Sequence, residues 1–318
     1  MIGLFLKEKY IPTNNINIKN LDFIIDRIKN NNDKLCRYVI ELYFEYYSII
    51  HESNIENIEI ELKKHYKNDI IEINDDVEKI ENCNLIISPS HSDTYFVLKQ
   101  LIKNRKENVL VICFDMHSDT YDYNDKLWKG NVFSKLIKEK FINNFIVLGV
   151  PNNKIKNTFN DIPCDIRNNV KIKKNFCIKD DIKKFKPTTI FISVDIDCLD
   201  TRKNKYSALE YCPMTILSNL SKADINGKTD EEIVMLVKNC IFVKNDLGYS
   251  NLYRVGENKL NIKKLIKKIK QIKKYCLKNK VNLGFNDKKI YADISEVNGY
   301  DYNKKTLEVI SKLIDELI

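Results

Sequence analysis

The fold is decided by the stretch NVLVICFDMHSDTYD at residues 108–122, in which an apolar run gives way abruptly to acidic residues and a histidine. An apolar run without polar alternation is typical of a strand that is buried on both faces of a sheet. Four other runs of this kind are NLIISPS (84–90), FIVLGV (145–150), TTIFISV (188–194) and KIYADIS (289–295). These five runs predict the strands of a central sheet.

Amphipathic segments lie between and after these predicted strands. Their apolar residues recur at helical spacing, which predicts helices at residues 92–104, 131–143, 229–239 and 303–318, and mostly helical structure at residues 20–54. Strands that alternate with helices form right-handed crossovers, which produce a mainly parallel sheet with helices on both faces. No stretch rich in proline, glycine or serine divides the chain. We therefore predict a three-layer α-β-α fold in one α/β domain over residues 1–318.

The net charge of +9, from 53 basic and 44 acidic residues, raises the question of an anionic partner. Its densest source is the segment from Lys259 to Lys280, which holds ten lysines and no acid. Apolar residues in this segment recur at helical spacing, which predicts an outer helix that packs on the body and exposes its lysines to solvent. We therefore expect neither a nucleic acid nor a membrane as partner.

The nine cysteines are scattered along the chain and form no C-x-x-C pair. An odd and unpatterned set of this kind is typical of reduced thiols in a cytoplasmic protein. The apolar run in the first ten residues is interrupted at Lys7 and is too short for a signal peptide. No apolar stretch approaches the length that a bilayer requires. These features predict a cytoplasmic location.

Polar residues follow three of the predicted strands, where the carboxyl ends of parallel strands collect functional groups. Alternate residues of an extended strand end point to the same side, so the D-x-H-x-D and D-x-D patterns would each aim their side chains at one spot. The candidate ligands are His91 after the first strand, Asp115, His117 and Asp119 after the second, and Asp195 and Asp197 after the fourth.

Converging carboxylates repel one another strongly unless cations lie between them. Two divalent ions would offset the charge, and a mixed set of carboxylates and imidazoles suits Mn²⁺. Two such ions would also lower the pKa of a shared water molecule towards neutrality. The pattern therefore predicts two Mn²⁺ per chain and a hydroxide that attacks an electrophilic carbon.

Four segments resemble the signatures of the ureohydrolase family, which includes arginases, agmatinases and formiminoglutamases. They are SHSD (90–93), FDMHSDTYD (114–122), SVDIDCLD (193–200) and YADISEVN (291–298). The resemblance implies the fold shared by arginases and deacetylases and two bridged Mn²⁺ ions. It implies one ion held by His91, Asp115, Asp119 and Asp195, and a second held by Asp115, His117, Asp195 and Asp197.

The resemblance also implies roles for residues around these ligands. Glu296 would pair with the guanidinium of a small cationic substrate or of an arginine-containing peptide, since a carboxylate recognises that planar cation by paired hydrogen bonds. The catalytic candidates are Asp119, Lys129 and Glu296, and the substrate-binding candidates are Glu296, Asp122 and Asp200. Family members are often trimers or hexamers, so the resemblance is compatible with a homo-oligomer.

The chain departs from the family pattern at several positions. Ser88, Pro89 and Ser90 stand where the family has Gly-Gly-Asp, and Thr201 replaces the usual proline. Lys129 stands where the family has a proton-shuttle histidine, and no histidine follows His117. The connection before YADISEVN is also longer than usual, which indicates an insertion at about residues 241–288.

Three hypotheses follow for the function. The first is a binuclear manganese hydrolase that attacks the guanidinium carbon of arginine, agmatine or an arginine derivative and releases urea and an amine. The second is a deacetylase of acetylated amines with one zinc ion on the same fold. The third is a metal-binding relative without catalytic activity, in which the lysine-rich helix contacts nucleic acid or a membrane.

Overall fold

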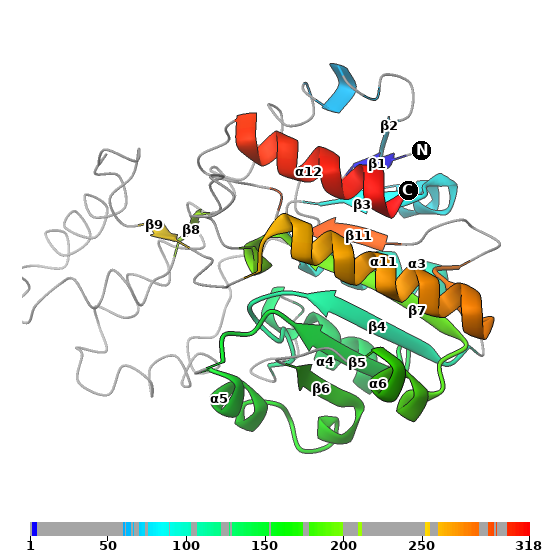
Figure 1. The fold of residues 1–318 in the computed structure, drawn as a ribbon, viewed down its shortest axis with the longest axis vertical. Helices are drawn as coiled ribbons and strands as arrows, with labels where there is room; N and C mark the ends of the chain where they lie inside the picture. Colours follow the sequence, from blue (N-terminus) through cyan, green and yellow to red (C-terminus); the bar gives the residue numbers. More distant parts are fainter. Residues whose placement is uncertain are drawn as a thin grey trace, which may run out of the picture.

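The computed structural model of the chain shows a layered body around one large sheet (Figure 1). It describes residues 2–4, 60, 62–64, 66, 70–73, 76–88, 90–102, 107–121, 127, 129–152, 154–173, 178–199, 209–211, 252–254, 260–285, 292–295, 297 and 304–318. The helices expected at residues 20–54 and 229–239 lie outside these residues.

The sheet has nine strands in the described part of the chain, and every recorded pairing between its strands is parallel. Its order is β2-β1-β3-β11-β7-β4-β5-β6, with β10 also paired to β7. The strands are β1 (Ile2–Leu4), β2 (Ile70–Glu72), β3 (Leu85–Ile87), β4 (Val109–Phe114), β5 (Asn144–Leu148), β6 (Val170–Lys173), β7 (Thr189–Asp195), β10 (Asn282–Leu283) and β11 (Ala292–Ser295). This arrangement confirms the predicted parallel sheet. A separate antiparallel pair consists of β8 (Leu209–Tyr211) and β9 (Leu252–Arg254).

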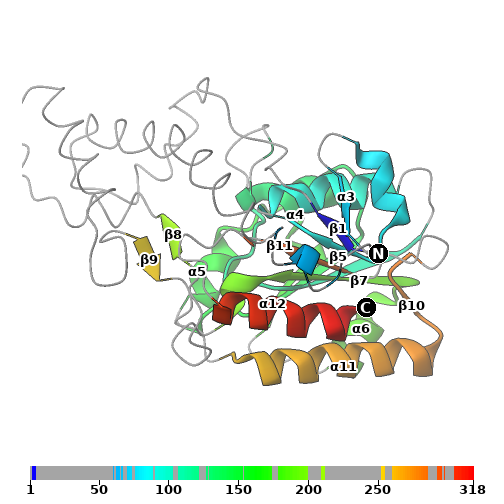
Figure 2. The same cartoon turned by 90° about the horizontal axis from the view of Figure 1, so that it is seen from above.

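Helices cover both faces of the sheet, as Figure 2 shows. One face carries α3 (Ser92–Ile102) and α4 (Val132–Lys138), and the other carries α6 (Ile178–Phe185), α11 (Ile262–Asn279) and α12 (Lys304–Leu317). Further helical elements are the short helix α5 (Ile155–Asn160) and the 3-10 turns η3 (Val77–Asn82), η4 (Lys129–Asn131), η5 (Arg167–Asn169) and η6 (Ile196–Cys198). The three-layer α-β-α prediction is therefore confirmed.

The central strand β4 explains why the sheet needs helices on both faces. All of its residues are buried, and neighbouring residues point into opposite layers. Leu110, Ile112 and Phe114 belong to the core shared with α11 and α12, whereas Val109, Val111 and Cys113 belong to the core shared with α3 and α4. Full burial of such a side chain contributes about 1.5–3 kcal/mol, so neither face of this strand could remain in water.

The lysine-rich segment forms α11, as its periodicity predicts. The side chain of Asn261 accepts a hydrogen bond from the backbone N–H of Lys264 and caps the first turn. One stripe of the helix is buried in the core, namely Leu265, Ile269, Ile272 and Cys276. The helix ends at Asn279, and the next residue, Lys280, adopts the left-handed conformation with φ 55°. This segment is therefore part of the α/β body.

The expected helix at residues 131–143 is shorter in the structure. Helix α4 ends at Lys138, and Lys140 adopts the left-handed conformation with φ 62°. The N–H of Phe141 donates to the carbonyl of Leu136, and the N–H of Lys140 donates to that of Ile137. These two bonds satisfy the last carbonyls of the helix and turn the chain towards β5. The apolar residues beyond the turn continue the helical spacing but belong to a loop.

Four strands of the sheet were not expected from periodicity. Strands β1 and β2 contain three residues each, β10 contains two, and β6 alternates lysines with apolar residues at the edge of the sheet. Runs this short carry little periodic signal, so only pairing with neighbours defines them. Among the described residues, no helix combines the length and hydrophobicity that a membrane crossing needs.

Candidate metal centre

Five of the predicted ligands gather at the carboxyl ends of the middle strands of the sheet. His91 lies between β3 and α3, Asp115 follows β4, and Asp195 is the last residue of β7. His117 and Asp119 lie in the loop after β4. We call His91, Asp115, His117, Asp119 and Asp195 the candidate metal centre.

His91 is the centre of this group, and its imidazole is fully buried. Its Nδ1 lies 2.8 Å from Oδ2 of Asp119, 3.2 Å from Oδ2 of Asp115 and 3.5 Å from Oδ2 of Asp195. The side chains of all three aspartates are at most 9% exposed. One imidazole nitrogen is therefore surrounded by three buried carboxylates from two different strand ends.

The charges around His91 alter its protonation. Burial by itself lowers the pKa of His91, but the interaction with Cys113 and hydrogen bonds with Asp115 and Asp119 raise it well above its ordinary value. Burial also raises the pKa of Cys113, so its thiol is protonated at neutral pH. We therefore attribute the raised pKa of His91 to the carboxylates. A protonated His91 provides one positive charge against three carboxylates.

Asp115 faces two histidines with its two oxygens. Its Oδ2 lies 3.2 Å from Nδ1 of His91, as described above, and its Oδ1 lies 3.7 Å from Nδ1 of His117. The same Oδ1 accepts a hydrogen bond of 2.6 Å from the backbone N–H of His117. The imidazole of His117 is 37% exposed, so this side of the group reaches solvent. Asp115 therefore lies between the two imidazoles, with one carboxylate oxygen towards each.

Asp119 is held in place by its backbone. It adopts a left-handed conformation with φ 47°, which aspartate tolerates better than most residues. Its carbonyl accepts a 3.0 Å hydrogen bond from the N–H of Phe133 in α4. The ring of Phe133 also packs edge-on against His91, with 5.2 Å between the ring centroids. Helix α4 thus positions a carboxylate and shields the imidazole from water.

The prediction that the ligands after β4 lie on alternate positions of an extended strand end was wrong. Strand β4 ends at Phe114, and residues 115–121 form bends and loop rather than an extended strand end. Strand β7 ends at Asp195, and the chain then turns through η6. The ligands after β4 therefore belong to a loop, in which Asp119 has a positive φ, and are not alternate residues on one face of a strand. The backbone of Asp197 lies in η6, and its side chain is outside the described residues.

Several other predicted residues cannot be placed in the group. Asp122, Asp200, Thr201 and Glu296 lie outside the described residues. Lys129 is the first residue of η4 and is half-buried. The N–H of Tyr121 donates to the carbonyl of Gly130, which joins the end of the ligand loop to η4. Lys129 therefore belongs to an element that is tied to the loop carrying Asp119.

Sequence reasoning missed three residues of the site. Cys113 has its Sγ 3.8 Å from Nε2 of His91 and 4.0 Å from Oδ2 of Asp115. Ser193 has its Oγ 3.1 Å from the same Nε2. Gly149 packs against the backbone of Asp115. The available signal was spacing, because Ser193 precedes Asp195 by two residues of β7 and shares its face, and Cys113 is the last residue but one of β4 before the ligand Asp115.

The donor set fits a divalent cation. Three carboxylates around one imidazole nitrogen need more positive charge than a protonated histidine provides. Carboxylate and imidazole donors suit Mn²⁺, and a thiol suits softer ions such as Zn²⁺. Ligand atoms of His91, Cys113 and Asp115 lie within 4.8 Å of one another. The described residues could therefore hold a metal ion, and their types do not distinguish one ion from two.

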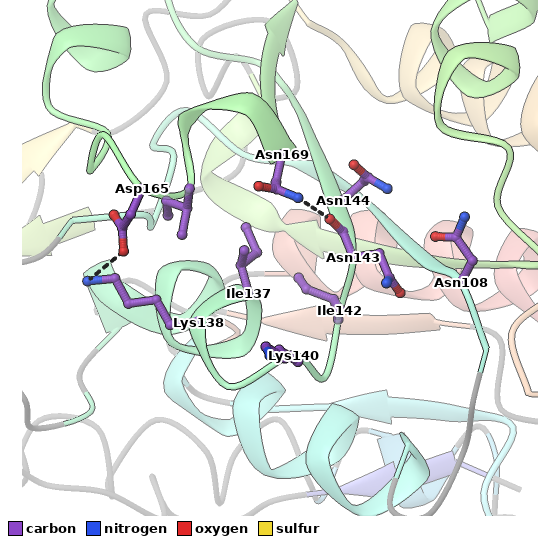
Figure 3. A pocket seen from close by; sticks show the side chains of 10 residues that line it. Asn108, Ile137, Lys138, Lys140, Ile142, Asn143, Asn144, Asp165 and Asn169 are labelled. Atoms are coloured by element: carbon purple, nitrogen blue, oxygen red, sulfur yellow. Dashed lines mark hydrogen bonds and ion pairs between the residues drawn. The ribbon is translucent and has the colours of Figure 1, made fainter.

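A separate cavity of about 820 Å³ lies at the amino ends of the strands, whereas the candidate metal centre lies at their carboxyl ends (Figure 3). It is lined by residues at the amino ends of strands, among them Asn108 before β4 and Asn144 at the start of β5. Lys138 and Asp165 form an ion pair of 3.8 Å at its rim. None of the predicted site residues lines it. The cavity is therefore distinct from the candidate metal centre.

No curated protein sequence matches this chain significantly, whereas several solved structures do. A formimidoylglutamase from Bacillus subtilis subsp. subtilis str. 168 is 18% identical with a TM-score of 0.41, over 84% of this chain and 65% of that one, so the chain spans less than two thirds of its length. The agmatine ureohydrolase of Thermoplasma volcanium is 15% identical with a TM-score of 0.41, over 78% and 70% of the two chains. Arginase from Bacillus cereus is 12% identical with a TM-score of 0.47, over 99% and 96%.

The family assignment rests on the sequence itself. A family model described as the arginase family matches residues 27–203. This range is more than half of the 318 residues, and it includes all five residues of the candidate metal centre. The chain therefore belongs to the arginase family.

Proposed function

We propose that this protein is a metal-dependent hydrolase that cleaves a guanidinium-type C–N bond and releases urea and an amine. The observation that carries the proposal is the group of three buried carboxylates around Nδ1 of His91. Membership of the arginase family supports the same chemistry. Arginine, agmatine and an arginine residue in a peptide are the substrates that we consider first.

We propose two Mn²⁺ as the cofactor. His91, Asp115, Asp119 and Asp195 would hold one ion, and Asp115, His117, Asp195 and Asp197 the other. The partly exposed His117 and the two-sided contacts of Asp115 support a second position next to the first. When bound, the ions supply positive charge and lower the pKa of a water molecule towards neutrality.

The chain's own residues would perform the remaining tasks. Glu296 would bind the planar cation of the substrate by paired hydrogen bonds, with Asp122 and Asp200 as further anionic contacts. Asp119 would accept the proton that the attacking water loses. Lys129 would donate a proton to the departing amine nitrogen in place of the histidine that other family members use. The buried face formed by Phe133 and His91 would exclude bulk water from the carboxylates.

The decisive experiment combines metal analysis with product detection. The purified protein is loaded with Mn²⁺ and offered arginine, agmatine, guanidinobutyrate, an arginine peptide and formiminoglutamate. We expect urea from one of the guanidino compounds, or formamide from formiminoglutamate, and about two Mn²⁺ per chain. Asp119→Asn should abolish product release. Asp165→Asn is the matched control, since Asp165 lies at the distant cavity and its side chain is 62% exposed.

Other results would contradict the proposal. Acetate release from acetylated polyamines with one zinc ion per chain would identify a deacetylase. Metal binding without any product, together with salt-dependent binding to nucleic acid, would identify a non-catalytic relative. Full activity of Asp119→Asn would exclude the candidate metal centre as the active site.

We also propose a cytoplasmic location and a single-domain chain with an insertion at about residues 241–288. The described cysteines form no disulfide bond, which supports a reducing compartment. Sedimentation of the purified protein would show whether it forms a homo-oligomer.

A further inference from the structure

We propose that the protein has a second, softer metal position, in which Cys113 holds a thiophilic ion such as Zn²⁺ together with His91 and Asp115. This position lies on the Nε2 side of His91, whereas Nδ1 of His91 faces the three carboxylates. It goes beyond the proposed function, because it adds a ligand and an ion that the manganese chemistry does not use. It rests only on the metal-binding part of that function.

The two ring nitrogens of His91 face different kinds of donor atom. Nδ1 lies within 3.5 Å of three carboxylate oxygens, as described above. Nε2 lies 3.8 Å from Sγ of Cys113 and 3.1 Å from Oγ of Ser193. Carboxylate oxygens suit hard ions such as Mn²⁺, and thiolate sulfur suits softer ions such as Zn²⁺. One imidazole therefore separates a hard set of donors from a softer set.

The register of the sheet places the softer donors. Cys113 of β4 is directly opposite Ser193 of β7, and Ser193 is in turn directly opposite Asp293 of β11. Residues that are directly opposite in neighbouring strands project from the same face and lie side by side. All three residues are fully buried. The thiol therefore lies in a polar row that crosses the central strands, among donor atoms and away from water.

The distances among the three ligand atoms fit a zinc ion. Ligand atoms of His91, Cys113 and Asp115 all lie within 4.8 Å of one another. Zinc bonds of about 2.0–2.3 Å in a tetrahedral arrangement separate neighbouring ligand atoms by about 3.3–3.8 Å. Sγ of Cys113 lies 3.8 Å from Nε2 of His91 and 4.0 Å from Oδ2 of Asp115. A contraction by a few tenths of an ångström would therefore close these atoms around an ion.

The charges of this position balance when the ion binds. A coordinating thiol is deprotonated outright, and its proton leaves to solvent as the ion enters. The two positive charges of Zn²⁺ then offset the thiolate of Cys113 and the carboxylate of Asp115. A neutral group is what burial favours, because isolated charges are costly to remove from water. The softer position is therefore compatible with the interior of the protein.

The softer position competes with the manganese position. Both use His91 and Oδ2 of Asp115, which lies 3.2 Å from Nδ1 of His91 and 4.0 Å from the thiol of Cys113. An ion that takes this oxygen removes it from the manganese ligands. Zn²⁺ should therefore displace Mn²⁺ and inhibit hydrolysis, and Cys113 should set the sensitivity of the protein to Zn²⁺.

The first measurement is a titration of the metal-free, full-length protein with Co²⁺, which substitutes for Zn²⁺ and gives a charge-transfer absorption band when a thiolate is a ligand. We expect this band in the wild type and in Asp119→Asn, because Asp119 faces Nδ1 of His91. Cys113→Ser and Cys113→Ala should lack the band. Cys83→Ser is the matched control and should keep it, since Cys83 is also buried but its thiol donates to the carbonyl of Lys79.

The second measurement is competition between the two ions. Mn²⁺-loaded protein is titrated with Zn²⁺, and the released Mn²⁺ is followed by its free-ion signal in electron paramagnetic resonance. Loss of an outer contact to a metal-bound histidine already lowers metal affinity about 10- to 100-fold, and Cys113 is a direct ligand. The Zn²⁺ concentration that releases half of the Mn²⁺ should therefore rise at least about tenfold in Cys113→Ser and less than about threefold in Cys83→Ser.

Three results would overturn the inference. The first is the absence of the band from the wild type, and the second is its survival in both Cys113→Ser and Cys113→Ala. The third is its loss in Asp119→Asn, which would merge the thiol and the carboxylates into one position. Asp195→Asn replaces Asp119→Asn if the latter fails to fold.

The two proposals can fail separately. If the wild type shows a band that depends on Cys113 but releases no urea, the inference stands and the hydrolase proposal fails. If urea is released and no such band exists, only the inference fails. A wild-type protein that binds no divalent ion would overturn both.

Discussion

Gly149 lies directly against the peptide of Asp115. A Cβ atom on Gly149 would come within 2.4 Å of the carbonyl oxygen and 2.9 Å of the carbonyl carbon of Asp115. The backbone of Gly149 also has φ 130°, a region that side chains rarely adopt. The N–H of Asp115 in turn donates to the carbonyl of Leu148. The residues at the end of β5 therefore fix the backbone of Asp115 in the candidate metal centre.

Gly149→Ala should displace Asp115 and weaken metal binding. The clash is with backbone atoms, which cannot rotate away, and the positive φ adds strain of about 1–3 kcal/mol. We expect a lower free energy of unfolding in urea and Mn²⁺ affinity reduced by at least tenfold. Gly284→Ala is the control. Gly284 also has a positive φ of 64°, but it follows β10 and its N–H bonds to Ile190 near the amino end of β7, away from the candidate metal centre. A normal Mn²⁺ affinity in Gly149→Ala would contradict this account.

Asp195→Asn should remove the stabilisation that the metal gives. A ligand present at 100 times its dissociation constant stabilises the folded state by about 2.7 kcal/mol. We expect Mn²⁺ to raise the thermal unfolding temperature of the wild type and of Asp165→Asn, whereas Asp195→Asn should show little change. The measurement is calorimetry with and without Mn²⁺. An equal shift in all three proteins would place the metal elsewhere.

Metal binding and stability should depend on pH through His91. Its pKa is raised in the folded protein, so the protonated imidazole stabilises the metal-free fold below the unfolded pKa of about 6.5. This contribution is lost as the pH rises through the folded pKa. Because a metal needs the neutral imidazole, Mn²⁺ affinity should increase over the same range. The free energy of unfolding of the metal-free wild type and of His91→Gln should be measured over a range of pH. The difference between the two proteins should become smaller as the pH rises.

Helix α11 should contribute to stability through its buried stripe only. Leu265 is fully buried in the core with the sheet, and Leu277 is 84% exposed on the same helix. Leu265→Ala should lower the free energy of unfolding by about 2–5 kcal/mol, because it leaves a cavity. Leu277→Ala should change it by less than about 0.5 kcal/mol. Equal effects in denaturant titrations would mean that α11 is not docked on the sheet.

The described cysteines should differ sharply in reactivity. Cys164 is exposed, whereas burial raises the pKa of Cys83 to about 11 and that of Cys276 to about 12. Only the thiolate reacts with alkylating reagents, so both buried thiols should be protected at neutral pH. Timed alkylation with peptide mass spectrometry should label Cys164 first. Rapid labelling of Cys276 in the native protein would show that α11 detaches.

Local sequence was sufficient for the predictions that depend on periodicity. The continuous apolar run of β4 indicated a strand buried on both faces, because no polar residue interrupts it. The stripe beginning at Leu265 indicated α11 for the corresponding helical reason. The residue types after β3, β4 and β7 also indicated a metal centre, since few other arrangements tolerate so many carboxylates beside His91.

Tertiary structure decided which strands are neighbours and therefore which side chains meet. Nothing in the local pattern indicates that β11, near the end of the chain, lies between β3 and β7. That placement alone brings Asp293 beside Ser193, just as the end of β5 brings Gly149 against Asp115. Periodicity reports only how a segment divides its own residues between core and water. Contacts across the sheet depend on the packing of segments that are distant in sequence, so the ligand types were readable from the sequence and their supporting contacts were not.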